Sequence, residues 1–180
     1  MPYEPPTSKL REVTALDDAP QLELLTTAHC QRLEEFERTN RAFFASRVSD
    51  RGDDYFTHFA DRLAERVAEN DAGQSLFFVL VAASGQIVGR VNISDIDKPP
   101  MTALGFRVDA GSQGKGIATR GVRAALEKAR QRGVRSIAAR AAVDNLASQR
   151  VLEHCGFTAI GPADPPPGSD RTFRGYRILL

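Results

Sequence analysis

The chain has 180 residues with 24 basic and 23 acidic side chains, so its formal net charge at pH 7 is only +1. Such a chain has no overall attraction to nucleic acid, and its longest apolar run, residues 76–83, is far too short to cross a membrane. Two cysteines and three scattered histidines predict a reducing, cytoplasmic setting and no metal site. We expect one domain over residues 8–180, behind a flexible, proline-rich tail of residues 1–7.

The first part of the domain predicts a strand followed by helices. Alternation over residues 10–14 predicts a strand. The acidic pair at residues 17–18 predicts the cap of a helix that continues to about Arg38, with a break near residues 26–27. A second acidic pair, at residues 53–54, predicts the cap of the next helix. The buried stripe of that helix is expected to be Phe56, Phe59, Leu63 and Val67.

Three antiparallel strands are predicted next. Residues 76–81 are apolar throughout, and Ser84-Gly85 is typical of a hairpin turn. The return strand is expected over residues 87–93, and a further antiparallel strand over residues 101–108.

A glycine-rich turn follows that strand. Gly111, Gly114 and Gly116 predict a tight turn, and the apolar spacing from Ile117 predicts a helix that ends at Gly133. A glycine-rich turn at a helix N-terminus exposes main-chain N–H groups and adds the positive end of the helix dipole. The spacing differs from that of a P-loop and of a dinucleotide-binding fingerprint. The turn therefore predicts a phosphate or pyrophosphate site of another kind.

The last third predicts a strand, a helix and two final strands. Residues 136–141 favour a strand, and Asp144 is expected to cap a helix that ends at Gly156. A stiff proline-rich loop over residues 163–169 then leads to a final strand over residues 172–180. Helices and strands in this order predict an α/β fold.

Two motifs in this region resemble those of one family. Residues 113–118 match the Q/R-x-x-G-x-G/A signature of the GCN5-related N-acetyltransferases, and residues 144–157 resemble their second motif, which joins an asparagine to a closing Gly-Phe. The resemblance covers roughly residues 75–160. It implies a central mixed, mostly antiparallel sheet of about seven strands with helices on both faces. It also implies acetyl-CoA as cosubstrate, an amine as acceptor and no metal.

The family likeness implies how the cofactor would bind. The turn would hold the pyrophosphate, and the main chain of residues 106–108 would bind the pantetheine arm, with the N–H of Val108 as the candidate oxyanion donor. Lys115 and Arg120 either neutralise phosphate charge or are solvated surface residues. The residues expected to contact the cofactor are Phe106, Arg107, Val108, Gln113, Gly114, Lys115, Gly116, Ile117, Ala118, Thr119 and Asn145.

The catalytic residues depart from the best-known family pattern. Many members have a tyrosine acid and a glutamate base at the positions that Leu152 and Arg140 occupy here. Asn145, Ser148 and Leu152 are spaced to share a helix face, so Ser148 is the nearest hydroxyl and our candidate acid. The alternative is a serine that bonds back to its own helix.

The N-terminal half adds a further likeness. Residues 39–44 followed by residues 53–56 resemble the ribosomal-protein-alanine N-acetyltransferases, the Rim-type branch, which use a serine at the corresponding position. Of the adjacent Phe43 and Phe44, either one packs in the core while the other covers a loop, or both form a wall of a substrate site. The Asp53-Asp54 pair lies within this likeness.

No general base is evident, with Asp164, Asp170 or a water chain as candidates. A weak base favours an α-amine, whose pKa is near ~8, over lysine near ~10.4. Three hypotheses follow: acetylation of a protein or peptide N-terminus, acetylation of a small amine such as an antibiotic or polyamine, and a non-catalytic acyl-CoA-binding module. A small-amine site would be lined by acidic residues, for which the candidates are Glu34, Glu35, Glu37, Asp53 and Asp54. The sequence is compatible with a monomer or a homodimer.

Overall fold

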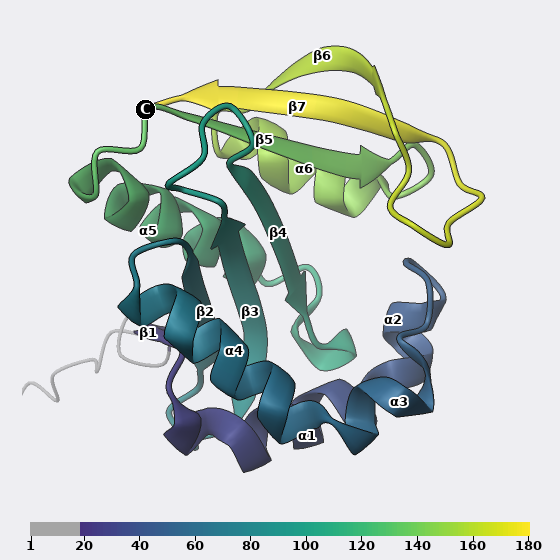
Figure 1. Cartoon of the computed structure of the whole chain (residues 1–180). Helices are drawn as coiled ribbons and strands as arrows, with labels where there is room; N and C mark the ends of the chain where they lie inside the picture. Colours follow the sequence, from purple (N-terminus) through teal and green to yellow (C-terminus); the bar gives the residue numbers. More distant parts are fainter. Residues whose placement is uncertain (1–18) are drawn as a thin grey trace, which may run out of the picture.

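The computed structural model describes residues 19–180, so the strand predicted for residues 10–14 lies outside the described part. A seven-stranded sheet with the order β1-β2-β3-β4-β5-β7-β6 forms the centre (Figure 1). Neighbouring strands are antiparallel except β4 and β5, which are parallel. This mixed, mostly antiparallel sheet confirms the predicted fold class. The strands are β1 (Gln21–Leu24), β2 (Leu76–Val81), β3 (Ile87–Ser94), β4 (Ala103–Val108), β5 (Ser136–Ala142), β6 (Thr158–Ala163) and β7 (Phe173–Leu179).

Helices cover both faces of the sheet, as predicted. Helices α1 to α4 pack on one face, and α5 and α6 on the other (Figure 1). None of the helices within residues 19–180 is long and apolar enough to traverse a lipid bilayer. The helices are α1 (Cys30–Thr39), α2 (Arg41–Ala45), α3 (Gly52–Thr57), α4 (Phe59–Asp71), α5 (Ile117–Gln131) and α6 (Leu146–His154), with 3₁₀ turns η1 (Thr27–His29) and η2 (Ala110–Ser112).

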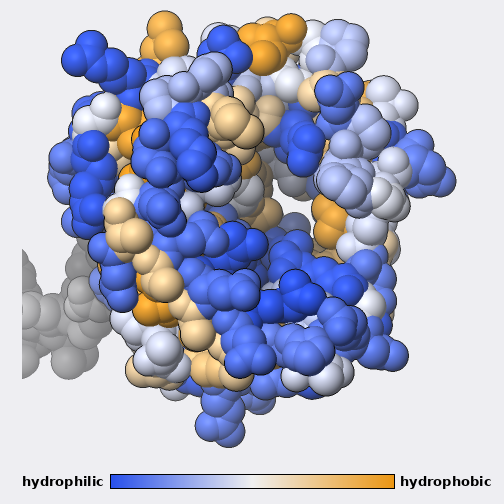
Figure 2. Space-filling view, viewed as in Figure 1, coloured by the Kyte–Doolittle hydropathy of each residue, from blue (hydrophilic) through white to orange (hydrophobic). Residues whose placement is uncertain are grey.

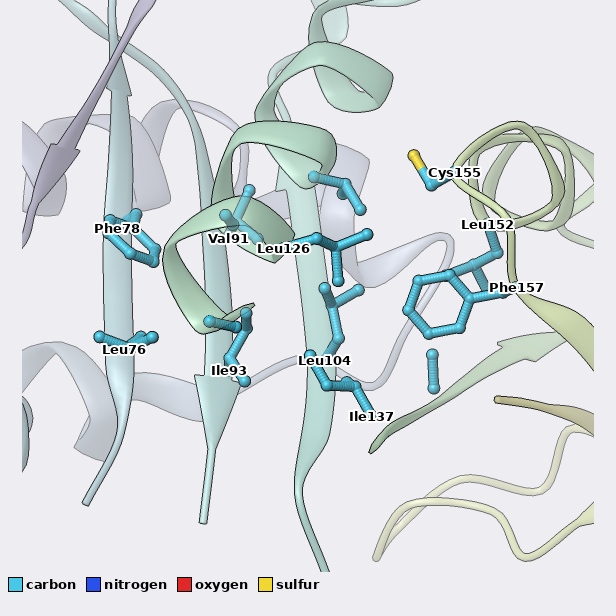
Figure 3. Close-up of a cluster of buried hydrophobic side chains, with 14 of the residues drawn as sticks. Leu76, Phe78, Val91, Ile93, Leu104, Leu126, Ile137, Leu152, Cys155 and Phe157 are labelled. Carbon is cyan, nitrogen blue, oxygen red and sulfur yellow. The ribbon is translucent and has the colours of Figure 1, made fainter. Parts of the chain in front are cut away.

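The α5/α6 face carries the larger apolar core. Leucine, isoleucine, valine and phenylalanine side chains from β2 to β5 meet those of both helices there (Figure 3). Helix α5 lies close to β2, since a Cβ atom on Gly121 would come within 2.8 Å of the Leu80 side chain. Strand β2 is buried along its whole length because both faces are covered, which explains its uninterrupted apolar sequence.

The helix predicted from residues 17–18 is wrong in its first half. Residues 21–24 form β1, which pairs with β2 from Gln21 opposite Val81 to Leu24 opposite Phe78. The apolar β2 would otherwise be an unpaired edge, and strand pairing outweighs the local helical spacing of the leucines. The break predicted near residues 26–27 is confirmed, because η1 lies there and α1 begins at Cys30.

The second predicted helix is present but divided. Residues 52–57 form α3, and α4 begins after His58, which is not helical. The acidic pair lies in the first turn of α3 and does not cap it, since the N-cap position is Arg51. Three residues of the predicted stripe, Phe56, Phe59 and Leu63, are buried as expected, and Val67 packs at the edge of the same core.

Candidate active site

The parallel strands β4 and β5 separate soon after they meet. Their pairing is limited to two positions, Ala103 opposite Ala138 and Leu104 opposite Ala139, and the strands then diverge (Figure 1). The N–H of Asp109 donates to Val88 in β3, and antiparallel pairing alternates the direction of successive main-chain groups. The N–H groups of Phe106 and Val108 therefore face the gap between β4 and β5.

The predicted glycine turn joins this gap to helix α5. Gly114 and Gly116 have φ values of 73° and 72°, which side-chain-bearing residues rarely adopt, and Gly116 is the N-cap of the 15-residue α5. Gly111 does not share this conformation, because it lies in the 3₁₀ turn η2. The N-cap glycine offers no side chain to bond the first N–H groups of α5, so these donors remain available to an anion.

Polar side chains hold the turn against the strand. The Nε2 group of Gln113 donates to the carbonyl oxygens of Val108 at 3.2 Å and Asp109 at 3.1 Å. The guanidinium group of Arg120 lies 3.7 Å from the position of a Cβ atom on Gly116. Lys115 is exposed. A ligand phosphate at the turn would thus have Arg120 beside it.

On the other side of the gap, the start of α6 presents Asn145 and Ser148. Asn145, not Asp144 as predicted, caps the helix, because its Oδ1 accepts the N–H of Ser148 at 3.2 Å. Asp144 lies outside the helix, with its carboxylate 3.8 Å from Arg171. Within residues 19–180, the Ser148 hydroxyl makes no hydrogen bond, so the alternative of a bond back to its own helix is not seen.

Ser148 and Leu152 lie one turn apart on α6, as their spacing requires, but only Ser148 lines the cleft. Leu152 is 1% exposed and packs in the core, whereas Val151 lines the cleft with Ser148. The helix is rotated so that Leu152 and Gln149 point inward, because Gln149 donates to the carbonyl groups of Ala142 and Val143. A side chain at position 152 would therefore lie away from the cleft in this chain.

The gap opens into a cleft of about 580 Å³. Figure 2 shows the molecule hollowed here, with hydrophilic residues around the opening. Both Phe43 and Phe44 line the cleft, as in the second alternative given above, and Phe44 also packs in the core. Of the predicted site residues it brings together Phe106, Arg107, Val108, Gln113, Ala118, Asn145 and Ser148. Those of the turn, Gly114, Lys115, Gly116, Ile117 and Thr119, are not among its lining residues.

A buried ion cluster lies on the wall of the cleft that faces α1 to α4. Glu37, only 2% exposed, bonds Arg90 at 2.7 Å and Arg107 at 3.0 Å. Burial works to raise the pKa of Glu37, but the two guanidinium groups hold it below its usual value. Burial and the nearby charge of Arg51 lower the pKa of Arg107 to about 10, so this group is still charged at neutral pH.

The acidic residues proposed to line a small-amine site do not do so. Glu37 is held in the ion cluster, and the other four do not line the cleft. Three of these four carboxylates form ion pairs outside the cleft: Glu34 pairs with Arg38, Asp53 with Arg41 and Asp54 with Arg62.

Other candidates for proton transfer also lie elsewhere. Asp164 and Asp170 are exposed and line neither the cleft nor its neighbouring groove. Cys155 packs in the core beside Thr119, and burial raises the pKa of its thiol, which is typical of a structural cysteine. No group of three potential metal ligands occurs within residues 19–180.

Comparison with known proteins identifies the family. The family described as "Acetyltransferase (GNAT) domain" matches residues 9–158. The chain belongs to the GNAT acetyltransferases. It is 30% identical over 148 residues, 78% of this chain and 81% of the relative, to the probable N-acetyltransferase YjcK of Bacillus subtilis (strain 168). It is accordingly an acetyl-CoA-dependent N-acetyltransferase, and the non-catalytic binding module is set aside.

Solved structures of GNAT acetyltransferases have the same fold. The ribosomal-protein-S5-alanine acetyltransferase from Vibrio fischeri superposes with a TM-score of 0.81 at 23% identity, covering 88% of this chain and 92% of that one. The spermidine N-acetyltransferase from Vibrio cholerae, solved with CoA and spermine, gives 0.71 at 18% identity, covering 88% and 94%. Because these two enzymes act on different amines, likeness of fold leaves the acceptor of this chain open.

Several arginines of the cleft were not predicted as site residues from the sequence. Arg51 and Arg90 are among them, and Arg107 was predicted only for its main chain. A usable signal was present in the strands, since Arg90 and Arg107 each interrupt an apolar run that is otherwise typical of a buried strand. A charged residue in such a position indicates a partner or a ligand.

Proposed function

We propose that this GNAT enzyme transfers the acetyl group to the α-amine of a peptide or protein N-terminus, as in the Rim-type branch. The observation that carries the proposal is the shortage of bases in the cleft. Asp50 is the one carboxylate among the described lining residues, and Arg41 binds it at 2.7 Å. An α-amine, with a pKa near ~8, is partly unprotonated at neutral pH, whereas a lysine or polyamine needs a stronger base.

In this proposal the glycine turn and the gap hold acetyl-CoA. The N–H groups at the start of α5 bind the pyrophosphate, and Arg120 adds positive charge beside Gly116. The main chain of Phe106 and Val108 binds the pantetheine arm, with Val108 N–H placed to donate to the thioester oxygen. Asn145 closes the site from α6, using its side-chain N–H₂ group, because its oxygen already caps the helix.

Ser148 serves as the acid in this scheme. The amine nitrogen attacks the thioester carbon, the C–N bond forms as the C–S bond breaks, and the Ser148 hydroxyl donates a proton to the leaving thiolate. The amine proton passes to water, because the cleft-lining residues of the described chain provide no free carboxylate, and water returns a proton to the Ser148 oxygen. Because no residue from 19 to 180 forms a hydrogen bond with the Ser148 hydroxyl, its proton is available.

A small polycationic amine is the less favoured acceptor. Five arginines, at positions 47, 51, 90, 107 and 140, line the cleft, and they would repel a polyamine. The acidic lining that the small-amine hypothesis predicted is not present among the described residues of the cleft.

The test is a comparison of acceptors by release of free CoA thiol from acetyl-CoA at pH 7. The acceptors are a peptide with a free alanine N-terminus, the same peptide with a blocked N-terminus and one lysine, and spermidine. We expect kcat/KM for the free N-terminus to exceed the other two by about tenfold or more, given their pKa values. A preference for the lysine peptide or for spermidine would overturn the proposal.

A further inference from the structure

The charges in the wall of the cleft do not balance. Arg90 and Arg107 lie directly opposite each other on β3 and β4, and both bond the single carboxylate of Glu37. Arg51 lines the same cleft, and its guanidinium group lies 4.5 Å from the ring centre of Tyr55. It forms no ion pair with any residue from 19 to 180. Three guanidinium groups therefore lie near one carboxylate, and only two of them are bonded to it.

Packing keeps this positive charge in place. Arg90 is 7% exposed, and Arg107 is held between Glu37 and the ring of Phe44, whose centre lies 4.6 Å from its guanidinium carbon. Like charges directly opposite each other in a sheet destabilise it, and here the pKa of Arg107 is lowered by burial and by Arg51. An anion bound between Arg51 and Arg107 would relieve that repulsion.

The cluster lies on the side of the cleft that faces α1 to α4. Arg107 alternates with Phe106 and Val108, so its side chain lies on the opposite face from theirs, toward α1 to α4. Arg51 and Arg90 also line an adjoining groove of about 1230 Å³ on that face. A molecule in the groove whose amine reaches the β4/β5 gap would present its neighbouring groups to these arginines.

We propose that the acceptor carries a carboxylate close to its amine, and that Arg51 and Arg107 bind this carboxylate. Two sources share the chemistry: an aspartate or glutamate side chain at the second or third position of a peptide, and the α-carboxylate of a free amino acid. For the first source, an acidic side chain in a peptide, the inference rests on the proposed function. A guanidinium group suits either because it donates two parallel N–H bonds to a carboxylate.

The experiment measures kcat/KM with matched acceptors. Two peptides begin with serine and differ only in aspartate or asparagine at the second position; a second pair carries the change at the third position. Free serine and free aspartic acid are tested beside them. Because a hydrogen bond to a charged group contributes about 1.5–3 kcal/mol, we expect the aspartate peptide of one pair to be acetylated about tenfold or more faster than its asparagine partner.

Variants link the preference to the arginines. Arg51→Gln should bring the aspartate-to-asparagine ratio close to one, and Arg51→Lys should restore part of it. Arg51 is exposed and forms no described ion pair, so the fold should tolerate the change. Arg132→Gln, an exposed arginine at the end of α5, is the control and should keep the ratio of the unaltered chain.

The outcomes separate the two proposals. Equal rates for aspartate and asparagine in both pairs, with the free amino acids acetylated no faster than the peptides, would overturn the carboxylate inference and leave the proposed function standing. Faster acetylation of the free amino acids than of any peptide would support carboxylate binding and overturn the peptide acceptor. A ratio that persists in Arg51→Gln would overturn the role of Arg51.

Discussion

The two faces of the sheet differ in how they build the cleft. On the α5/α6 face, the turn, the strand and both helix starts come from residues 103–148, and an apolar core supports them. On the α1–α4 face, the wall depends on Glu37 meeting arginines that lie 53 and 70 positions further along the chain. The first face uses local main-chain geometry, whereas the second uses buried charge.

This contrast shows where each face is vulnerable. A main-chain anion site fails when a side chain or charge enters it, with little effect on the rest of the fold. A buried carboxylate between two guanidinium groups fails when one member is removed, because the others remain buried without compensation. Substitutions in the glycine turn should therefore weaken cofactor binding, whereas substitutions in the buried ion cluster should lower the stability of the fold.

The largest effect is expected for Gly116→Glu. A carboxylate at the start of α5 would repel the phosphates, and the φ of 72° would strain any side chain. We expect affinity for CoA, measured by calorimetry, to fall by about a hundredfold or more, or about 2.7 kcal/mol. Gly85→Glu is the control, since Gly85 has a φ of 83° and open space around it in the hairpin turn. Equal loss of affinity in both variants would mean that strain alone is responsible.

Glu37→Gln tests the other face through stability. Removing the charge should lower the free energy of unfolding by about 3 kcal/mol at pH 7, measured by urea denaturation. Glu34→Gln, which removes an exposed pair with Arg38, should cost at most about 0.5 kcal/mol. Similar losses in the two variants would contradict the importance of the buried cluster.

The difference in unfolding free energy between the unaltered chain and Glu37→Gln should shrink at low pH. Because the pKa of Glu37 is lowered in the folded state, its contribution is complete above the ordinary glutamate pKa of about 4.3 and disappears as the pH falls through the lowered value. The gap between the unaltered chain and Glu37→Gln should therefore narrow below about pH 4. A gap that stays constant down to pH 2.5 would mean that the carboxylate contributes through packing.

Ser148→Ala should have the smallest effect on cofactor affinity and on stability. Its effect should be a lower kcat. Loss of the acid should lower kcat by about a hundredfold while the Kd for CoA changes less than about twofold. Single-turnover kinetics with a fixed peptide make the measurement, and Ser84→Ala in the β2–β3 turn is the control. An unchanged kcat would show that water protonates the thiolate.

Sequence reasoning succeeded where the signal was local. The strand, the glycine turn and the helix from Ile117 follow from adjacent residues, and the structure contains all three. It failed at residues 21–24, where pairing with β2 outweighs helical spacing, and at Asp144, where the cap is one residue later. It did not show that Leu152 packs in the core instead of lining the cleft, because the rotation of α6 depends on Gln149 and on the core beneath it.

The sequence by itself determined the family, the cofactor and the conformation of the turn, because each depends on the order of neighbouring residues. Only the tertiary structure decided the charge of the cleft wall that faces α1 to α4. Glu37, Arg51, Arg90 and Arg107 come from a helix, the end of a loop and two strands. Electrostatic interaction falls off with distance in space and does not depend on separation along the chain, so no local pattern could place these charges together.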